Sequence, residues 1–147
     1  MIQPVTTPYQ IECKNLWKVF GPNAQNFKPN MSQSKEEILQ QTGHVVAVQD
    51  VSFNVRKGEI FVIMGLSGSG KSALIRCLSR LIEPTTGEVL LDGNDILGMN
   101  EVELRELRRH RLSMVFQHFG LFAHRQIIDN VAYGLEVQGV DKTSRHE

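Results

Sequence analysis

The sequence has no excess charge of either sign, because 16 Lys and Arg residues stand against 16 Asp and Glu residues in 147 positions. A nucleic-acid-binding chain usually carries a basic footprint, so zero formal charge gives no support for that function. Four arginines do cluster between residues 105 and 111. We interpret this cluster as a solvated helix C-terminus, where cations suit the helix dipole, and predict no nucleic-acid partner.

Long apolar runs and a secretory leader are also missing. No segment approaches the ~20 apolar residues that cross a bilayer. The first residues, which include Pro4 and Pro8, lack the apolar centre of a signal peptide. The chain is therefore expected to be cytosolic, and it could still dock on a membrane protein.

Cysteine is scarce, because Cys13 and Cys77 are the two thiols and they form no Cys-x-x-Cys pair. Reduced thiols are therefore expected, with Cys77 as an ordinary core residue. The five histidines show no metal-ligand spacing, and none is predicted to bind a metal. At 147 residues and 41% hydrophobic composition, the chain suffices for one modest domain with its own core.

The most informative segment is residues 65–72, which read G-L-S-G-S-G-K-S and match the phosphate-binding loop Gly-x-x-x-x-Gly-Lys-Ser/Thr. Its glycines lack a β-carbon, so the backbone can form a tight concave loop with N–H groups that point at phosphate oxygens. A helix that begins near Gly70 adds its N-terminal dipole. Lys71 would then reach the β- and γ-phosphates, and the Ser72 hydroxyl would ligate Mg²⁺. A nucleoside triphosphate site is predicted.

The flanks of this loop supply the expected context. Residues 60–64 form an apolar run of β-formers, which is typical of a strand buried in a parallel sheet. After the loop, apolar residues recur at helical spacing: Ala73, Leu74, Cys77, Leu78 and Leu81. The segment therefore has the strand, loop and helix order of a P-loop.

Other elements are predicted before the loop. Residues 11–20 are predicted to form a first strand, and the polar stretch over 21–34 is predicted to be a surface loop. Ser34 and Glu37 have the spacing of a capping box that opens a helix to about residue 42, which Gly43 ends. Residues 45–55 alternate as a half-exposed strand.

Beyond the loop helix, Pro84 and Gly87 bracket a turn before a strand over 88–92, and the Asp92-Gly93 pair predicts a hairpin turn. The remaining predicted elements are a helix over 101–110, a buried strand over 112–117 and a helix over 126–138.

A capping box over residues 144–147 would open another helix just where the sequence stops. We therefore expect a fragment of a longer protein.

These motifs together resemble the nucleotide-binding domain of an ABC transporter. The loop has the form usual in that family, and its spacing to residues 114–117 fits the family's Q-loop. Within the family, the chain is most similar to the ATP-binding subunits of glycine betaine/proline (quaternary-amine) importers. The segments that carry this likeness are 58–64, 80–84, 117–122, 129–134 and the excursion over 21–45.

The resemblance implies an α/β fold, the N-terminal part of a P-loop NTPase of the ABC ATPase type. This fold has a mixed sheet with an antiparallel β subdomain, followed by the start of a helical subdomain. Residues 1–125 would form the ATPase core, with the excursion at 21–45, and residues 126–147 the truncated helical subdomain. The protein would lie peripherally on the cytoplasmic side of the inner or plasma membrane.

The resemblance also implies ATP and Mg²⁺ as cofactors and assigns site residues. Ser72 and Gln117 would hold Mg²⁺, and Gln117 would sense the γ-phosphate. No residue beyond Lys71 carries a catalytic role. The nucleotide would be bound by Gly65, Ser67, Gly68, Ser69, Gly70, Lys71, Ser72, Ala73 and Phe20. Phe20 is the candidate that stacks on adenine; Trp17 is the alternative stacker, and Phe20 would then be a core aromatic.

Two kinds of partner are implied as well. Residues His118 to Phe122 would face the coupling helix of a membrane-spanning permease subunit, although this apolar stretch could instead be a buried loop anchor. A second ATPase subunit would complete a sandwich dimer in the full-length protein.

The chain departs from the family pattern in two ways. Ala73 stands where the family commonly has a hydroxyl that touches the α-phosphate, which weakens binding by roughly 0.5–1.5 kcal/mol. The 147 residues also contain no Leu-Ser-Gly-Gly-Gln signature, no apolar strand that ends in Asp-Glu and no later switch histidine. Residues 89–92 resemble such a strand, but Gly93 follows in place of the catalytic Glu. The 147-residue chain is therefore expected to bind ATP without hydrolysing it.

Three functions follow from these residues. The first is the ATP-binding part of an importer subunit for osmoprotectants, with an amino-acid importer as the close variant. The second is a truncated module that binds nucleotide only. The third, a small-molecule P-loop kinase, lacks a basic lid-like segment after the loop helix and leaves the Q-loop unexplained.

Overall fold

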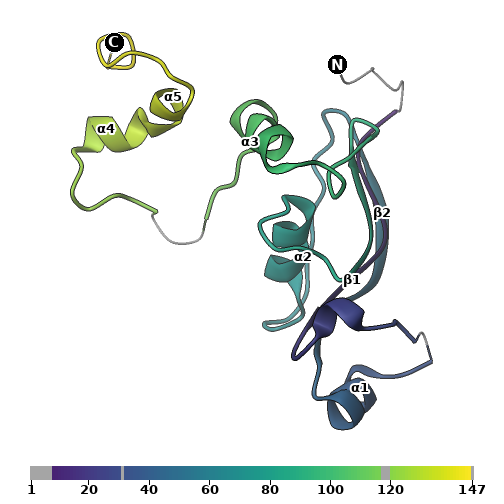
Figure 1. Cartoon of the computed structure of the whole chain (residues 1–147). Coiled ribbons are helices and arrows are strands. Elements are labelled where there is room, and N and C mark those ends of the chain that lie inside the picture. Colours follow the sequence, from purple (N-terminus) through teal and green to yellow (C-terminus); the bar gives the residue numbers. More distant parts are fainter. Residues whose placement is uncertain (1–7, 31, 117–119, 147) are drawn as a thin grey trace. The chain divides into compact units, whose positions relative to one another are not determined.

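The computed structural model describes residues 8–30, 32–116 and 120–146 (Figure 1). It separates into two units, residues 1–99 and residues 100–147, which are described below one at a time. The boundary predicted after residue 125 concerns the subdomains of the whole ATPase, and it stays a prediction.

The first unit is built on an antiparallel four-stranded sheet. Its strands are β1 (Tyr9–Phe20), β2 (Val45–Arg56), β3 (Thr86–Leu91) and β4 (Asn94–Asp95). Their order in the sheet is β2-β1-β3-β4, and each neighbouring pair is antiparallel. The strands predicted over 11–20, 45–55 and 88–92 are confirmed, and so is the antiparallel β part of the predicted fold.

A bulge interrupts the two long strands where Asn15 of β1 meets Asp50 of β2. Both residues have φ of +47°, and the Asn15 side-chain amide donates to the Asp50 carboxylate at 3.0 Å. On β2 the buried positions change parity there, from Val46 and Val48 to Val55. A single extra residue thus changes which side chains of β2 face the core.

The excursion between β1 and β2 holds a short 3₁₀ helix (Ala24–Asn26) and helix α1 (Lys35–Thr42). The predicted capping box is present, because Ser34 Oγ accepts from the Glu37 amide at 3.1 Å and the Glu37 carboxylate accepts from the Ser34 amide at 2.7 Å. Gly43 ends the helix at φ +69°. The start and the end of α1 are therefore both where the sequence predicts them.

Helix α1 is attached to the sheet through one buried side chain. Ile38 is 1% exposed and belongs to a core cluster with Trp17, Val19 and Val46. Half-buried Phe27 packs on this cluster from the excursion, with its ring 6.2 Å from that of Trp17. The excursion is thus a structured part of the first unit, and α1 lies at one end of the long strand pair (Figure 1).

Substituting alanine for Ser34 is expected to lower the free energy of unfolding by about 1 kcal/mol, because the Glu37 amide would lose its cap. The measurement is chemical denaturation followed by circular dichroism. Ser113, an exposed serine outside any helix, is the matched control, and its alanine variant should stay within about 0.5 kcal/mol of the parent. Equal effects of the two substitutions would show that the cap contributes nothing.

The phosphate-loop helix forms, whereas the strand predicted before it does not. Helix α2 (Lys71–Leu78) begins after Gly70, buries Leu74 and Cys77, and packs against β1 and β2 (Figure 1). Residues 60–64 form no strand, and the exposed fractions of Ile60 and Met64 are 91% and 86%. The prediction of a buried strand here was therefore wrong for this structure.

The prediction of a strand over 112–117 was also wrong for residues 112–116, the part that the structure describes. Residues 112–116 form no strand, and Val115 is 99% exposed. Both segments read as central strands of a parallel sheet, which form only when neighbouring strands satisfy their backbone N–H and C=O groups. The four described strands all belong to the antiparallel sheet, so neither segment has a partner there.

The turn between β3 and β4 is the predicted hairpin, with φ of +49° at Asp92 and +76° at Gly93. Positive φ at both central residues is what a type I′ turn requires. Gly87 lies inside β3 at φ +107°, not in the turn predicted before that strand. A β-carbon there would come within 2.6 Å of the Asn15 carbonyl oxygen, so the glycine permits the close approach of β1.

The second unit is helical. Helix α3 (Glu101–His110) starts with a capping box between Asn100 and Glu103, and its bounds are those predicted. The helix predicted over 126–138 is divided into α4 (Ile127–Val131) and α5 (Tyr133–Val137) at Ala132. Because Ala132 is the side chain buried there, at 3% exposed, while Ile127 and Val131 are exposed, the predicted apolar stripe is not the packed face.

The last described residues are capped by Asp141. Its carboxylate accepts from the amides of Thr143 and Ser144 at 3.1 Å, and Ser144 Oγ donates to it at 2.6 Å. These hydrogen bonds hold the pKa of the Asp141 carboxyl below its usual value. The predicted box over 144–147 includes Glu147, which lies outside the described residues. Over the described ranges, no helix is long and apolar enough to cross a membrane.

Candidate nucleotide-binding site

The loop between residues 65 and 70 has the backbone that its glycines predict. Gly68 and Gly70 adopt φ of +77° and +95°, which lie in the region that favours glycine. A β-carbon on Gly70 would overlap the Ala47 carbonyl oxygen of β2, and one on Gly65 would come within 2.7 Å of Ser69 Oγ. The loop therefore packs closely on itself and on β2, and only glycine fits at Gly70.

Lys71, the first residue of α2, reaches back across the loop. Its ammonium donates to the carbonyl oxygens of Gly65 at 2.8 Å and Leu66 at 2.6 Å, with Ser69 Oγ at 3.4 Å. A lysine bonded to neutral carbonyls keeps its full positive charge for an incoming anion. Lys71 thus fixes the shape of the loop and places a cation at its mouth.

A cavity of about 480 Å³ opens beside the loop. Its walls come from α1, β2, the segment before the loop and the start of α2, and the loop residues on it are Gly65, Ser69, Gly70 and Lys71. Among the described residues that line it, the charged ones are Lys71 and Lys35, the first residue of α1. The charge on these described walls is therefore positive, which favours an anion, although much of the lining is apolar.

The structure brings most of the predicted phosphate-binding residues together. Gly65 to Ser72 form one loop and the first turn of α2, where unsatisfied backbone N–H groups and the positive end of the dipole coincide. The hydroxyls of Ser67 and Ser72 are on exposed residues and are free to turn toward an anion or a metal. Ala73 follows on the half-buried side of α2 and offers no hydroxyl.

A triphosphate requires a tight loop of backbone N–H groups, and the glycines permit it here, because a β-carbon at Gly70 would overlap the Ala47 carbonyl oxygen and one at Gly65 would crowd Ser69 Oγ. The loop residues therefore fit ATP. Mg²⁺ prefers oxygen ligands and usually keeps waters and substrate phosphate oxygens, so the Ser72 hydroxyl could supply one of its ligands.

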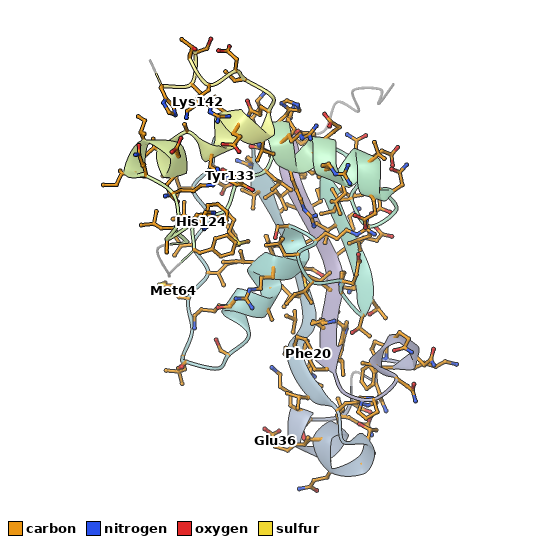
Figure 2. The ribbon with its side chains drawn as sticks, turned by 60° about the vertical axis from the view of Figure 1, so that its left-hand side comes forward. Phe20, Glu36, Met64, His124, Tyr133 and Lys142 are labelled. Carbon is orange, nitrogen blue, oxygen red and sulfur yellow. The ribbon has the colours of Figure 1, made fainter. Side chains whose placement is uncertain are left out.

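The two candidates for adenine stacking differ in burial. Trp17 is 2% exposed and packs in the core, whereas Phe20, at the end of β1, is 42% exposed. The Lys18 ammonium lies 4.8 Å from the centroid of the Phe20 ring, and the residue is exposed enough for a base to reach it. Figure 2 shows Phe20 at the end of the strand pair that leads to α1. Because Trp17 is buried, it has no accessible ring face on which a base could stack.

The described part of the predicted permease-facing stretch has two different roles. Phe122 packs on Tyr133, with ring centroids 4.8 Å apart, and the Asn130 side chain accepts from its amide at 2.8 Å. Phe122 thus anchors the loop, while Leu121 is 66% exposed. Gln117, His118 and Phe119, which include the predicted Mg²⁺-sensing glutamine, lie outside the described residues.

The two thiols are buried in the core of the first unit. Cys13 of β1 and Cys77 of α2 are both free, as expected, and both are about 1% exposed or less. Burial raises the pKa of both thiols, that of Cys13 to about 11 with a further contribution from Cys77. Both are therefore neutral core groups near pH 7.

Sequence reasoning missed Lys35 as a lining residue of this cavity. Its sequence signal is that of an ordinary first-turn residue behind a capping serine. Only the fold shows that α1 returns to β2 beside the phosphate loop. No local pattern could have found this residue.

The comparisons with known proteins agree with the geometry of the site. Residues 48–147 match the family described as ABC transporter, so this chain belongs to the ABC transporter family. It is 53% identical over 140 residues to the glycine betaine/carnitine transport ATP-binding protein GbuA of Listeria monocytogenes, and 50% identical to the glycine betaine/proline betaine ATP-binding protein ProV of Escherichia coli. Each match covers 94% of this chain and 35% of the relative. The chain thus spans about a third of these proteins.

Solved structures share the fold. A dimeric, post-hydrolysis state of the ATP-binding cassette MJ0796 bound to ADP and Pi is 27% identical, with a TM-score of 0.71 over 92% of this chain and 52% of that chain. A second dimeric structure of the same cassette gives a TM-score of 0.72. The α/β P-loop fold of an ABC ATPase is therefore confirmed.

Proposed function

We propose that this chain is the phosphate-loop part of the ATP-binding subunit of an importer for glycine betaine, proline or similar osmoprotectants. The observation that carries the proposal is the loop over 65–72, with Lys71 placed across its mouth, in a chain about half identical to two betaine transport ATP-binding proteins. The full subunit would couple ATP binding and hydrolysis to transport.

The residues of the loop would act on the nucleotide by position and charge. The amides of the loop and of the first turn of α2 would bind the phosphates, and Lys71 would exchange its carbonyl partners for the β- and γ-phosphate oxygens. Phe20, which is exposed at the end of β1, would stack on adenine. When bound, Mg²⁺ would neutralise phosphate charge, with Ser72 as a ligand and Gln117 as its sensor.

The partners follow from the same proposal. Permease subunits would be contacted by His118 to Phe122, of which exposed Leu121 is the described residue best placed for an apolar contact. A second ATPase subunit would form a sandwich dimer with the full-length protein, on the cytoplasmic side of the inner or plasma membrane. The similar cassette with ADP and Pi is itself dimeric, which supports this arrangement.

An amino-acid importer is the alternative solute class. A methionine import ATP-binding protein from Desulfitobacterium hafniense is 49% identical, but over 98 residues and 67% of this chain. The betaine relatives match 94% of the chain. The greater coverage favours the osmoprotectant importer.

A chimera tests the transport proposal directly. The 140 aligned residues of GbuA would be replaced by those of this chain in a host that lacks its own betaine ATPase subunit. We expect uptake of radiolabelled glycine betaine to be retained, and to be lost when the chimera also carries Lys71→Ala. A chimera that is expressed stably but restores no uptake would contradict the proposal.

The chain itself is expected to bind ATP without turnover, because its 147 residues hold no Asp-Glu strand and no signature motif. Steady-state phosphate release should equal that of the Lys71→Ala variant, while a fluorescent ATP analogue still binds. Turnover that Lys71→Ala abolishes would refute the binding-only reading. Transfer of the γ-phosphate to an acceptor instead of water would indicate a kinase.

A further inference from the structure

Lys35 lines the same cavity as the phosphate loop, although it comes from the excursion between β1 and β2. Its side chain is half-buried, and it forms no hydrogen bond or ion pair within the described ranges of the chain. A lysine that gives up part of its hydration without a counter-ion is unfavourable, and an anion in the cavity would offset that cost.

The position of Lys35 is fixed from both sides. The capping box at Ser34 sets the backbone just before it, and Ile38, one turn later, is 1% exposed in the core. The side-chain amide of Gln49 on β2 donates to the Gln33 carbonyl at 3.5 Å, and Gln49 lines the cavity too. Lys35 therefore lies on a helix that is held against the core.

Lys35 and Lys71 differ in the hydrogen bonds that a bound anion would have to replace. Lys71 is bonded to carbonyl oxygens, so it must break two hydrogen bonds to reach a ligand. Lys35 has no such hydrogen bond to break among the residues that the structure describes. A polyphosphate also bears more negative charge than one lysine and one helix terminus neutralise. A second ammonium on the same cavity suits such a ligand better than a singly charged anion.

We propose that Lys35 is a second cationic residue of the nucleotide site and binds the polyphosphate of ATP. This inference rests on the proposed function and extends it, because the excursion becomes part of the ATP site. Figure 2 shows α1, marked by Glu36, beyond the strand end that carries Phe20. ATP binding would then also stabilise the position of α1.

The test is the affinity of the chain for ATP, ADP and AMP, measured by displacement of a fluorescent ATP analogue. Lys35→Gln should weaken ATP binding by about 3- to 10-fold, with a smaller loss for AMP. Lys35→Arg, which keeps the charge, should stay within about twofold of the parent. Lys28→Gln is the matched control, because Lys28 is an exposed lysine of the same excursion that does not line the cavity.

Amine labelling gives a second readout that needs no variant. ATP should protect Lys35 and Lys71 against acetylation, as followed by mass spectrometry, and leave Lys28 unprotected. Equal affinities of Lys35→Gln and Lys28→Gln, or a loss from Lys35→Gln that is the same for AMP and ATP, would overturn the inference. Failure of the proposed function is distinguishable, because the parent chain would then bind no ATP or Lys71→Ala would bind it normally.

Discussion

Gly70→Ala is expected to lower the free energy of unfolding of the first unit by about 3–5 kcal/mol and to abolish ATP binding. The new β-carbon would overlap the Ala47 carbonyl oxygen, which is backbone and cannot rotate away. The φ of +95° adds strain of about 1–3 kcal/mol for any residue with a β-carbon. Relief requires α2 to move off β2, which would also open the phosphate loop.

Gly68 offers the matched control for this substitution. It has a similar φ of +77°, but a β-carbon there meets nothing within 4 Å. Gly68→Ala should therefore show the backbone strain alone, about 1–3 kcal/mol. Urea denaturation of both variants checks the difference. Equal destabilisation would show that the close contact of Gly70 with β2 does not exist in solution.

Lys71→Ala is expected to weaken ATP binding by about 10- to 100-fold, since a charge-assisted hydrogen bond to a phosphate contributes roughly 1.5–3 kcal/mol. The same change also frees the carbonyls of Gly65 and Leu66 from their shared donor. Because these carbonyls belong to exposed residues, water can replace the lysine. Stability should consequently change little.

The matched control here is Lys57→Ala, at an exposed turn residue before the loop. It removes the same charge and should change the ATP dissociation constant by less than about twofold, because exposed charges are screened. Displacement titrations of the two variants side by side measure the contrast. If Lys71→Ala and Lys57→Ala lost the same affinity, the loss would reflect net charge and not the loop.

The elements that the sequence predicted correctly are those whose signals are local. The capping box at Ser34, the bounds of the helix over 101–110 and the Asp92-Gly93 turn each depend on hydrogen bonds or φ angles within a few residues. In the phosphate loop the positive φ of Gly68 and Gly70 and the Lys71 hydrogen bonds to Gly65 and Leu66 are local as well, whereas the close contact of Gly70 with Ala47 of β2 is not. The local features needed no knowledge of the rest of the fold.

The elements that the sequence predicted wrongly depend on distant partners. Residues 60–64 and 112–116 have the composition of buried strands, but the described residues offer them no neighbouring strand. The composition of a segment indicates that it can be buried as a strand, but the strand forms only where a neighbouring strand pairs with it. Likewise, Lys35 lines the cavity beside the loop because α1, anchored to the core by Ile38, packs against β2.

The most direct test of the nucleotide site at residues 65–72 is a titration of the folded chain with ATP in the presence of Mg²⁺. Hydrogen exchange is followed in the segment over residues 65–78. We predict saturable binding and slower amide exchange in the loop and in α2, because their N–H groups would donate to the phosphates. A folded chain that shows neither saturable binding nor any change of exchange in this segment would contradict the assignment of the site.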